Sequence, residues 1–398
     1  MKDIVIIADF CGPMDGTFNS RFLYLADLLC ENSDNKVEVI TSDYCHGSKS
    51  PINRDKLQPH KYKITLLHEF PYKRNISFIR FLGHFTWGYN VKKYLEQREK
   101  PDVVYCAIPP LSGPYFAAKY CDKNGIDFVI DIQDLWPEAY KMVFNVPIVS
   151  DVLFFPFNYL ANGIYKRANE IVAVSQTYVD RALKVNEKCS KGFSVFLGTN
   201  LDTFDINASK PPVLDKQPGE KWLAYCGSLG SSYDLTCVID ALDIINQNRI
   251  APKFIVMGSG PREKEFKDYA IKKNVDAAFT GRLPYDQMCA FLSKCDFTVN
   301  PITHGAAQSI INKHGDYAMS ALPVINTQEC KEYRDLVEHY NMGFNCKNND
   351  AKDLSQKLIM LMSDEHLCKM MGSNSRKCAE EKFDRRSSYK VIVDILEK

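Results

Sequence analysis

The chain has 398 residues, of which 45% are hydrophobic and 25% are charged, and its net charge is +1. These values exclude a disordered or fibrous chain, and the neutral charge balance argues against the strongly basic surface of a general nucleic-acid-binding protein. No stretch approaches the roughly 20 apolar residues that a membrane-spanning helix needs. The 14 cysteines include no Cys-x-x-Cys pair, which indicates reduced thiols in a cytoplasmic protein.

The first half of the sequence alternates short, β-branched apolar runs with helix-like segments. We expect strands at 4–8, 37–41, 64–67, 103–106, 128–132, 171–174 and 195–197. Near-continuous apolar strands separated by helices are typical of a parallel sheet that is covered on both faces. The pattern therefore predicts a Rossmann-like domain over residues 1–205.

A polar stretch with two consecutive prolines interrupts this alternation and predicts a linker at 206–221. Expected strands then resume at 222–226, 254–257, 278–280, 297–299 and 323–326. We expect a second Rossmann-like domain over residues 222–398, whose last helix packs back on the first domain. The predicted fold class is thus α/β, with two doubly wound parallel sheets that face each other across a cleft.

Two strand ends in the first half carry residues suited to a ligand. The loop after the first strand contains Gly12 and Gly16, whose backbone amides can approach a phosphate, although an ordinary strand-to-helix turn has the same composition. Gln133 and Asp134 follow the fifth strand, in an acidic segment that also contains a tryptophan. A carboxylate there can bind sugar hydroxyls or move a proton, and helix capping by Asp134 is the structural alternative.

The second half has small-residue loops at two successive strand ends. Gly227 and Ser228 follow its first strand, and Gly258 and Gly260, with Arg262 behind them, follow the next. Such residues let a helix present free N–H groups to an anion. Neither loop continues as a P-loop, and the absence of a GxGxxG fingerprint disfavours a nicotinamide enzyme.

The strongest candidate segment begins at Gln308 and Ser309 and contains Lys313 and Asp316. The last two lie one helical turn apart, so a cation for a diphosphate and a carboxylate for a ribose can point the same way. Spacing alone favours the simpler explanation, a surface ion pair between them. The sequence has no Asp-x-Asp triplet and no His-x-x-x-His pair, so we expect no metal.

Taken in order, these segments resemble the family 4 glycosyltransferases of the GT-B fold over nearly the whole chain, most closely the branch that builds bacterial surface polysaccharides. The matching stretches are 131–138, 168–175, 198–202, 227–230, 258–261, 280–284 and 309–325. The resemblance implies a retaining transfer without metal or cofactor. The donor would be a nucleotide diphosphate sugar, most simply a UDP-sugar, and the acceptor a saccharide, often lipid-linked, in capsule, O-antigen or exopolysaccharide synthesis.

The resemblance also implies roles for single residues. The C-terminal half would hold the donor: Asp316 stands where a Glu usually binds ribose, and Arg282 and Leu283 border the base. Gly12 and Gly16 match the loop that nears the donor phosphates. The predicted catalytic residues are Asp134, Gln133 and Lys313, and the predicted donor-binding residues are Gly12, Gly16, Gly227, Ser228, Gly258, Gly260, Arg262, Arg282, Leu283, Gln308, Ser309 and Asp316.

The sequence departs from the family pattern in its charged residues. Gln308 and Asp316 stand where the family has paired glutamates, and Ser228 and Asp234 stand where many relatives carry Arg and Lys. The diphosphate charge would then fall to Lys313 and to an arginine, Arg262 or Arg282. These departures keep two alternatives open: a nucleotide-sugar 2-epimerase of the same fold, and a non-catalytic nucleotide-sugar-binding scaffold.

Residues 61–100 carry nine Lys or Arg residues against three Glu, interleaved with aromatic residues. Basic side chains beside aromatic ones suit an interfacial membrane contact. We favour peripheral attachment of this stretch to the inner face of the cytoplasmic membrane, and a core helix with a solvated basic face explains the same pattern.

Overall fold

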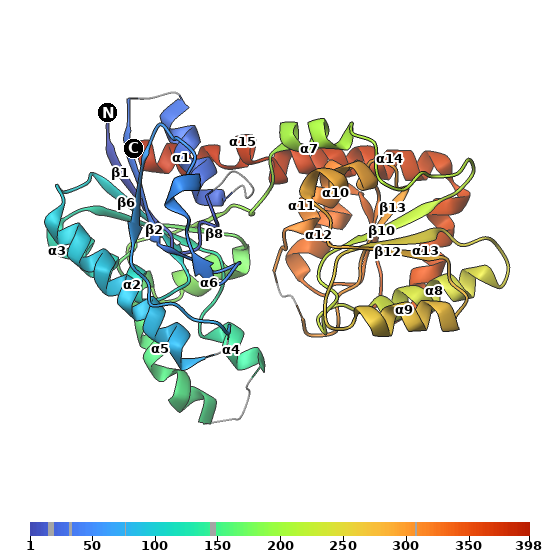
Figure 1. The fold of residues 1–398 in the computed structure, drawn as a ribbon, viewed down its shortest axis with the longest axis horizontal. Coiled ribbons are helices and arrows are strands. Elements are labelled where there is room, and N and C mark those ends of the chain that lie inside the picture. The colour runs from blue at the N-terminus through green and yellow to red at the C-terminus, as the bar shows by residue number, and fades with distance from the viewer. Residues whose placement is uncertain (15–19, 32–33, 76, 144–148, 307–308) are drawn as a thin grey trace. The chain divides into compact units, whose positions relative to one another are not determined.

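The computed structural model describes residues 1–14, 20–31, 34–75, 77–143, 149–306 and 309–398, which divide into two compact units (Figure 1). Unit 1 comprises Met1–Val195 and Tyr389–Lys398, and unit 2 comprises Phe196–Ser388. Each unit contains one large parallel sheet with an apolar cluster on either face. The predicted α/β class, with parallel sheets in two domains, is therefore confirmed.

The sheet of unit 1 has the order β5-β2-β1-β6-β7-β8-β9, and every neighbouring pair is parallel. Its strands are β1 (Asp3–Ile7), β2 (Lys36–Ser42), β5 (Lys63–Leu67), β6 (Val103–Ile108), β7 (Asp127–Ile132), β8 (Glu170–Ala173) and β9 (Phe193–Ser194). The last expected strand, 195–197, is displaced, since the pairing ends at Ser194. A short hairpin of β3 (Tyr44–Cys45) and β4 (Ser50–Pro51) was not predicted, because two residues show no periodicity.

Helices cover both faces of this sheet. They are α1 (Arg21–Glu31), α2 (Phe78–Gln97), α3 (Ser112–Asn124), α4 (Glu138–Val143), α5 (Val149–Tyr165), α6 (Gln176–Leu183) and α16 (Lys390–Glu397). Apolar residues of α2, α3, α5 and α6 form one buried cluster, and those of α1 and α16 form the other. The helix at the C-terminus is thus part of unit 1.

The sheet of unit 2 has the order β12-β11-β10-β13-β14-β15 and is also parallel throughout. Its strands are β10 (Trp222–Cys226), β11 (Lys253–Met257), β12 (Ala277–Gly281), β13 (Phe297–Asn300), β14 (Val324–Asn326) and β15 (Gly343–Asn345). The first five match expected strands, whereas β15 was not predicted. The order reverses between β10 and β13, and ligands of such sheets bind beyond the strand ends at this point.

The helices of unit 2 pack in two layers, one on each face of the sheet (Figure 1). They are α7 (Leu201–Ala208), α8 (Leu235–Asn246), α9 (Glu263–Lys272), α10 (Tyr285–Leu292), α11 (Lys313–Met319), α12 (Lys331–Tyr340), α13 (Ala351–Ser363), α14 (Glu365–Cys378) and α15 (Arg385–Ser388). A π-helical turn, Ala379–Phe383, joins α14 to α15.

The chain enters unit 2 at Phe196, ten residues before the linker expected at 206–221. Helix α7 covers the beginning of that stretch, and Lys216 further along pairs with Asp296 at 2.6 Å. The proline pair marks an irregular segment on the surface of unit 2. A local break in periodicity predicts such a segment, but it does not distinguish a loop within a domain from a connection between domains.

Candidate functional site

The small-residue loops of unit 2 lie against each other at the carboxyl ends of β10 and β11. The amide N–H of Gly227 donates to the Met257 carbonyl at 3.0 Å, and that of Leu229 donates to the Ser259 carbonyl at 3.0 Å. A Cβ atom at Gly258 would overlap the Gly227 carbonyl oxygen, and one at Gly260 would lie 2.5 Å from the carbonyl oxygen of Leu229. Glycine is therefore required at 258 and 260 because another backbone segment occupies the side-chain position.

A pocket of about 350 Å³ opens above these loops. It brings together five of the predicted donor-binding residues, from the ends of β10, β11 and β12. Its lining consists of Cys226, Gly227, Ser228, Met257, Gly258, Ser259, Arg282, Leu283 and Met288. We call it the glycine-loop pocket. Arg282 is exposed and has no carboxylate partner in the described parts of the chain, so its guanidinium can serve a ligand.

Lys313, the first residue of α11, reaches the same loops. Its Nζ lies 3.3 Å from the position that a Cβ of Gly227 would take. The ammonium stands 4.3 Å from the centre of the Tyr225 ring and 4.2 Å from that of Tyr233, which suits a cation–π contact. The side chain is 8% exposed, and Nζ has no hydrogen-bond partner among the described residues. Burial lowers the pKa of Lys313 to about 7.

Lys313 and Asp316 do not form the ion pair that their spacing favours. Asp316 instead accepts a hydrogen bond from the Tyr285 hydroxyl at 3.0 Å, and burial raises its pKa to about 6. The Tyr285 hydroxyl also lies 2.9 Å from that of Thr199. The surface ion-pair interpretation is therefore wrong, because the two side chains find different partners.

Two other charged positions are engaged locally. Arg262 pairs with Glu265 through contacts of 2.6 and 2.8 Å and is not among the residues that line the glycine-loop pocket. Asp234 caps α8 by accepting from the Cys237 amide at 3.1 Å. Of the two arginines considered for a diphosphate, the geometry therefore favours Arg282.

The remaining predicted donor-binding residues are placed as follows. In unit 2, the carbonyl of Ser309 accepts a hydrogen bond of 2.9 Å from Gln328. In unit 1, Gly12 lies in the loop after β1 with φ of +80°, in the left-handed region that glycine tolerates. Gly16 and Gln308 lie outside the described residues.

The two predicted catalytic residues of unit 1 lie just beyond β7. The Asp134 carboxylate accepts from the Leu135 amide at 2.9 Å and from the Trp136 indole at 3.2 Å, rather than from an amide of α4. Burial raises its pKa. The Gln133 amide N–H donates to the Ile108 carbonyl at 2.7 Å, and its buried side-chain nitrogen has no hydrogen-bond partner within the described ranges.

Unit 1 also contains a buried cluster that the sequence did not reveal. Asp9 after β1 and Glu69 after β5 lie 3.1 and 3.3 Å from Nδ1 of His84 on α2, and burial raises the pKa of Asp9 to about 7. The three groups are close enough to hold a metal ion, with ligand atoms within 4.8 Å of one another. However, Arg80 donates to Nε2 of His84 at 3.0 Å, which places the proton of a neutral imidazole on Nδ1, facing the carboxylates. In this state the cluster holds a proton where a metal would have to bind.

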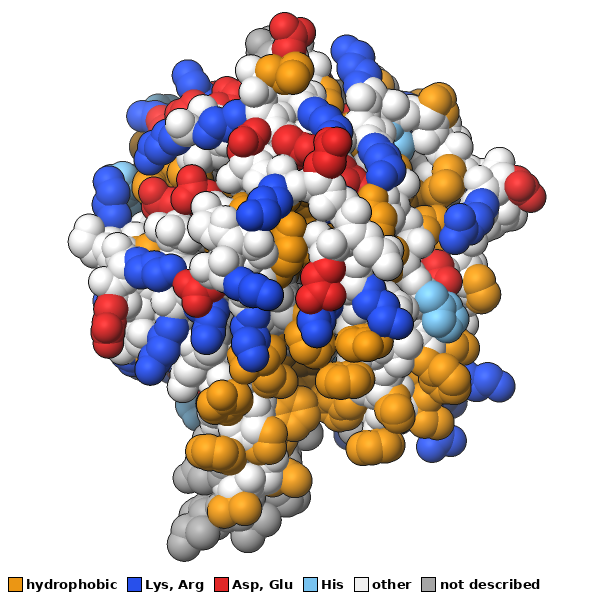
Figure 2. All heavy atoms as spheres, turned by 90° about the vertical axis from the view of Figure 1, so that its left-hand side faces the viewer, with side chains coloured by type: hydrophobic (Ala, Val, Ile, Leu, Met, Phe, Trp, Pro, Cys, Tyr) orange, Lys and Arg blue, Asp and Glu red, His pale blue; other side chains and the backbone are white. Residues whose placement is uncertain are grey.

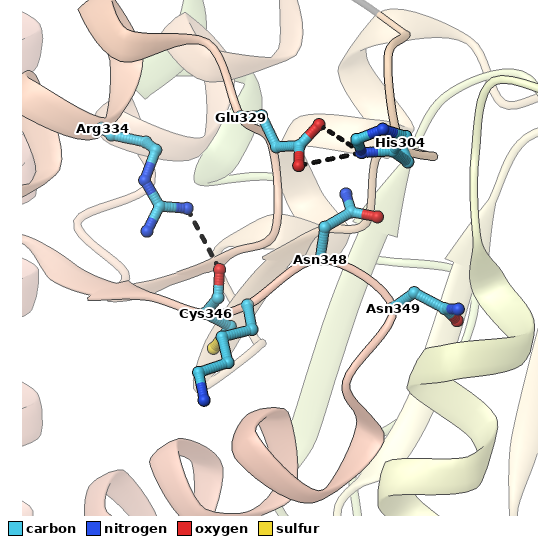
Figure 3. A pocket seen from close by; sticks show the side chains of 7 residues that line it. His304, Glu329, Arg334, Cys346, Asn348 and Asn349 are labelled. Atoms are coloured by element: carbon cyan, nitrogen blue, oxygen red, sulfur yellow. Dashed lines mark hydrogen bonds and ion pairs between the residues drawn. The ribbon is translucent and has the colours of Figure 1, made fainter.

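A larger pocket of about 660 Å³ lies near the ends of β13, β14 and β15, and contains none of the predicted site residues (Figure 3). His304 and Glu329 point toward each other at one side of it, with Nδ1 of His304 2.9 Å from a carboxylate oxygen of Glu329. Arg334 donates to the Cys346 carbonyl at 3.1 Å. These contacts engage His304, Glu329 and Arg334, whereas Lys347 also lines the pocket and has no carboxylate partner in the described ranges.

Known proteins share this fold. Residues 207–378 match the family model "Glycosyl transferases group 1", a segment that contains both glycine loops and α11. An uncharacterized glycosyltransferase of Methanocaldococcus jannaschii, MJ1178, is 21% identical over 347 residues, which are 86% of each chain. Unit 2 therefore carries the glycosyltransferase group 1 sequence pattern.

Solved structures agree with this assignment of the fold. HepE of Anabaena, crystallised with UDP, superposes with a TM-score of 0.68 at 15% identity over 99% of both chains. WaaG, a glycosyltransferase involved in lipopolysaccharide biosynthesis, superposes with a TM-score of 0.64 at 16% identity, also over 99% of both chains. The chain has the two parallel α/β domains of the GT-B glycosyltransferases.

Proposed function

We propose that this protein is a retaining glycosyltransferase that binds a nucleotide diphosphate sugar, most simply a UDP-sugar, in the glycine-loop pocket. The observation that carries the proposal is Lys313. A buried ammonium without a hydrogen-bond partner is costly, and here it lies at the point where the strand order of unit 2 reverses, beside two glycine loops. A diphosphate would be the negatively charged partner that the Lys313 ammonium lacks.

The donor would bind through residues from four elements. Its diphosphate would lie on the loops at Gly227 and Gly258, with Lys313 and Arg282 offsetting its charge. Asp316, held by Tyr285, would accept from the ribose hydroxyls. The match of residues 207–378 to the glycosyltransferase family supports a donor site in unit 2, and the UDP in the HepE crystals supports the class of donor.

In the proposed reaction, the bond between the anomeric carbon and the diphosphate oxygen breaks as Lys313 stabilises the charge that develops on the leaving group. The acceptor hydroxyl attacks from the face that the nucleotide leaves, so the anomeric configuration is retained, and its proton passes to the departing phosphate. No metal or cofactor enters this scheme. Asp134 and Gln133 of unit 1 remain the residues predicted to act on the sugar or the acceptor.

The acceptor is proposed to be a saccharide, lipid-linked, in the synthesis of a bacterial surface polysaccharide. WaaG, which has the same fold, is involved in lipopolysaccharide biosynthesis, and this supports the pathway class. We also propose that residues 61–100 bring the protein to the inner face of the cytoplasmic membrane.

The proposal is tested by incubating the full chain with a panel of nucleotide sugars, with and without saccharide and lipid-linked acceptors. We expect release of nucleoside diphosphate only when an acceptor is present, and a product with the anomeric configuration of the donor by NMR. An epimer formed without acceptor would indicate the 2-epimerase, and binding without turnover would indicate the scaffold. Either result would contradict the proposal.

The role of Lys313 is tested by Lys313→Met. Loss of one preorganised charged group at a reacting centre lowers kcat roughly 100- to 1,000-fold, and we expect a loss of that size. Lys264→Met is the matched control, because Lys264 is exposed on α9 and pairs only with Asp268 among the described residues. Unchanged turnover of a folded Lys313→Met variant would refute the proposed diphosphate contact.

A further inference from the structure

Arg80, in the first turn of α2, is held in a fixed orientation. Its Nε donates to Nε2 of His84 at 3.0 Å, and its Nη1 donates to the Asn75 carbonyl at 2.7 Å. The guanidinium carbon lies 5.2 Å from the centre of the Trp136 ring and 5.9 Å from that of Tyr72, which suits cation–π contacts. Within the described parts of the chain Nη2 has no hydrogen-bond partner, so one edge of the guanidinium is available to a ligand.

A second cation lies beside the same tyrosine. Lys49, in the turn between β3 and β4, places its Nζ 5.1 Å from the centre of the Tyr72 ring and donates to the His46 carbonyl at 2.5 Å. The Tyr72 hydroxyl lies 2.6 Å from Nδ1 of His46. Burial, with the charges of Lys49 and Arg80, lowers the pKa of His46 to about 4, so its imidazole is neutral near pH 7. We call Lys49, Tyr72 and Arg80 the basic cluster of unit 1.

Neither cation of the basic cluster pairs with a carboxylate of the described residues. Arg80 donates to an imidazole and a carbonyl, and Lys49 donates to a carbonyl. The buried carboxylates of Asp9 and Glu69 face Nδ1 of His84, whereas Arg80 meets Nε2 of the same ring. Burial and then the charge of Arg80 lower the pKa of Lys49, so the two cations repel each other.

Other basic residues of the stretch 61–100 stand beside acids. Lys63 and Arg98 both pair with Glu38, at 2.9 and 3.1 Å. Figure 2 shows the same arrangement more widely, with Lys and Arg side chains interspersed with Asp and Glu over the upper part of one face of the molecule. The basic cluster differs because like charges meet there without an acid, and a bound anion would relieve their repulsion.

The basic cluster lies at the edge of the sheet where ligands are expected. Lys49 lies in the hairpin that follows β2, Tyr72 follows β5, and Trp136 follows β7. The carboxyl ends of parallel strands share one edge, and open α/β sheets bind their ligands there. The Trp136 indole, beneath the Arg80 guanidinium, donates to Asp134 at 3.2 Å. The cluster therefore adjoins a residue that is predicted to act on the sugar or the acceptor.

We propose that the basic cluster binds an oxyanion, a carboxylate or a phosphate, and that the acceptor saccharide carries this acid group. The oxyanion site stands on the contacts of Arg80 and Lys49 alone, whereas its assignment to the acceptor rests on the proposed function. A guanidinium edge and an ammonium together offer several N–H donors to the oxygens of one acid group. Hydrogen bonds between ionised partners are stronger than those between neutral groups.

The test is a ligand-observed NMR titration of the full chain, without donor, with glucuronate, glucose 6-phosphate and glucose. These probes share one sugar ring and differ in the acid group. We expect an acid probe to bind roughly 10- to 100-fold more tightly than glucose. Tighter binding of glucuronate would assign a carboxylate to the site, and tighter binding of glucose 6-phosphate would assign a phosphate. The proposal is overturned if neither acid probe binds more tightly than glucose.

Substitutions locate the acid group. Lys49→Gln and Arg80→Gln should each weaken binding of the preferred acid probe by roughly tenfold or more. Lys119→Gln is the matched control, because Lys119 Nζ lies 5.5 Å from the centre of the Tyr115 ring, in a similar contact outside the cluster. Circular dichroism checks folding, and the half-buried turn residue Lys49 provides the test if Arg80→Gln does not fold. Acid binding that survives in both folded variants would overturn the proposal.

Lys313→Met distinguishes the basic cluster from the glycine-loop pocket, which is also proposed to bind an anion. This variant should bind the acid probe as the parent does, because its substitution lies in unit 2. Loss of acid binding in Lys313→Met, with binding retained in the Lys49 and Arg80 variants, would place the probe in the donor pocket and overturn the proposal.

The assignment to the acceptor is tested by transfer. We expect acceptors that carry the preferred acid group to have a KM at least roughly tenfold below that of neutral analogues, and Lys49→Gln to remove this advantage. Equal KM values would overturn the assignment to the acceptor and leave the proposed function standing. Acid binding without any transfer would support the oxyanion site and contradict the proposed function.

Discussion

Lys313 is a charged residue whose native surroundings oppose its charge. It has two aromatic rings and a glycine loop around its ammonium, and no carboxylate partner in the described chain. The lowered pKa expresses the same fact, because desolvation favours the neutral amine. Such a residue reduces the stability of the empty protein and gains a partner when an anion binds, which is common at functional sites.

This pKa makes the stability of unit 2 depend on pH. The pKa of Lys313 is about 7 in the folded protein, whereas the ordinary value for a lysine is 10.5, so unfolding takes up a proton between these values. Stability should therefore fall as the pH drops from about 10 to 7. Replacing Lys313 with Met removes this cost, and we expect the variant to be more stable than the parent by about 2–4 kcal/mol at pH 7.5.

Urea unfolding of both proteins at pH 7.5 and pH 10 measures this difference. The difference in unfolding free energy between the two proteins should shrink by more than half at pH 10. At that pH, close to the ordinary pKa of 10.5, protonating the lysine of the unfolded chain releases much less free energy. An equal gap at both pH values would mean that Met stabilises by packing alone, and that the native ammonium is not strained by burial.

The two glycine loops of unit 2 act as one element. The backbone of the loop after β10 occupies the space that side chains at 258 and 260 would need, and three amide hydrogen bonds join the loops, the third from Arg262 to the Leu229 carbonyl. This close approach leaves the pocket floor free of side chains at Gly227 and Gly258. Gly230, a few residues along, has no such neighbour, since the nearest atom to a Cβ there is the Ser228 hydroxyl at 3.4 Å.

This difference predicts that two Gly→Ala substitutions in neighbouring loops change stability by different amounts. Gly258→Ala should destabilise the protein by about 1–3 kcal/mol, because the new methyl group meets the Gly227 carbonyl and forces the loops apart. Gly230→Ala should change stability by less than about 1 kcal/mol. Thermal unfolding of the pair, followed by donor titration, checks both effects. Equal destabilisation would show that the loops are not closely packed.

The whole molecule consists of two units, and unit 1 is built from two separate parts of the sequence. Unit 1 is completed by the last ten residues, in which Tyr389, Ile392 and Leu396 are fully buried against α1 and the sheet. The Arg21 guanidinium, paired with Asp131 inside unit 1, also lies 4.7 Å from the centre of the Tyr389 ring. The C-terminal segment therefore belongs to the stability of the first half of the chain.

Changes in α16 should thus destabilise unit 1 while unit 2 keeps its own stability. Truncating a buried Ile or Leu to Ala costs about 2–5 kcal/mol, so Ile392→Ala combined with Leu396→Ala should lower the unfolding temperature of unit 1 by roughly 10 °C or more. Scanning calorimetry with and without UDP separates the two transitions, because most of the proposed donor contacts lie in unit 2 and the ligand should stabilise that unit more. A shift confined to the transition that UDP stabilises would contradict the assignment of α16.

The alternation of strands and helices is predictable from the sequence, because buried parallel strands are apolar along their whole length and this pattern is local. The same pattern places Gly227, Gly258, Arg282 and Leu283 at strand ends, where a parallel sheet collects its ligand-binding residues. The unit boundary is not predictable in this way, since the proline pair near 211 interrupts periodicity whether or not a domain ends there.

Which charged groups are free depends on the tertiary structure. Lys313 and Asp316 have the spacing of an ion pair, but the chain around them directs one to Tyr225 and Tyr233 and the other to Tyr285. Asp9, Glu69 and His84 are distant in sequence and meet because β1, β5 and α2 pack together. Local patterns follow from neighbours along the chain, whereas the desolvation and pairing of a charged group depend on its neighbours in space. Only the tertiary structure therefore decides which buried charged group lacks a partner and can bind a ligand.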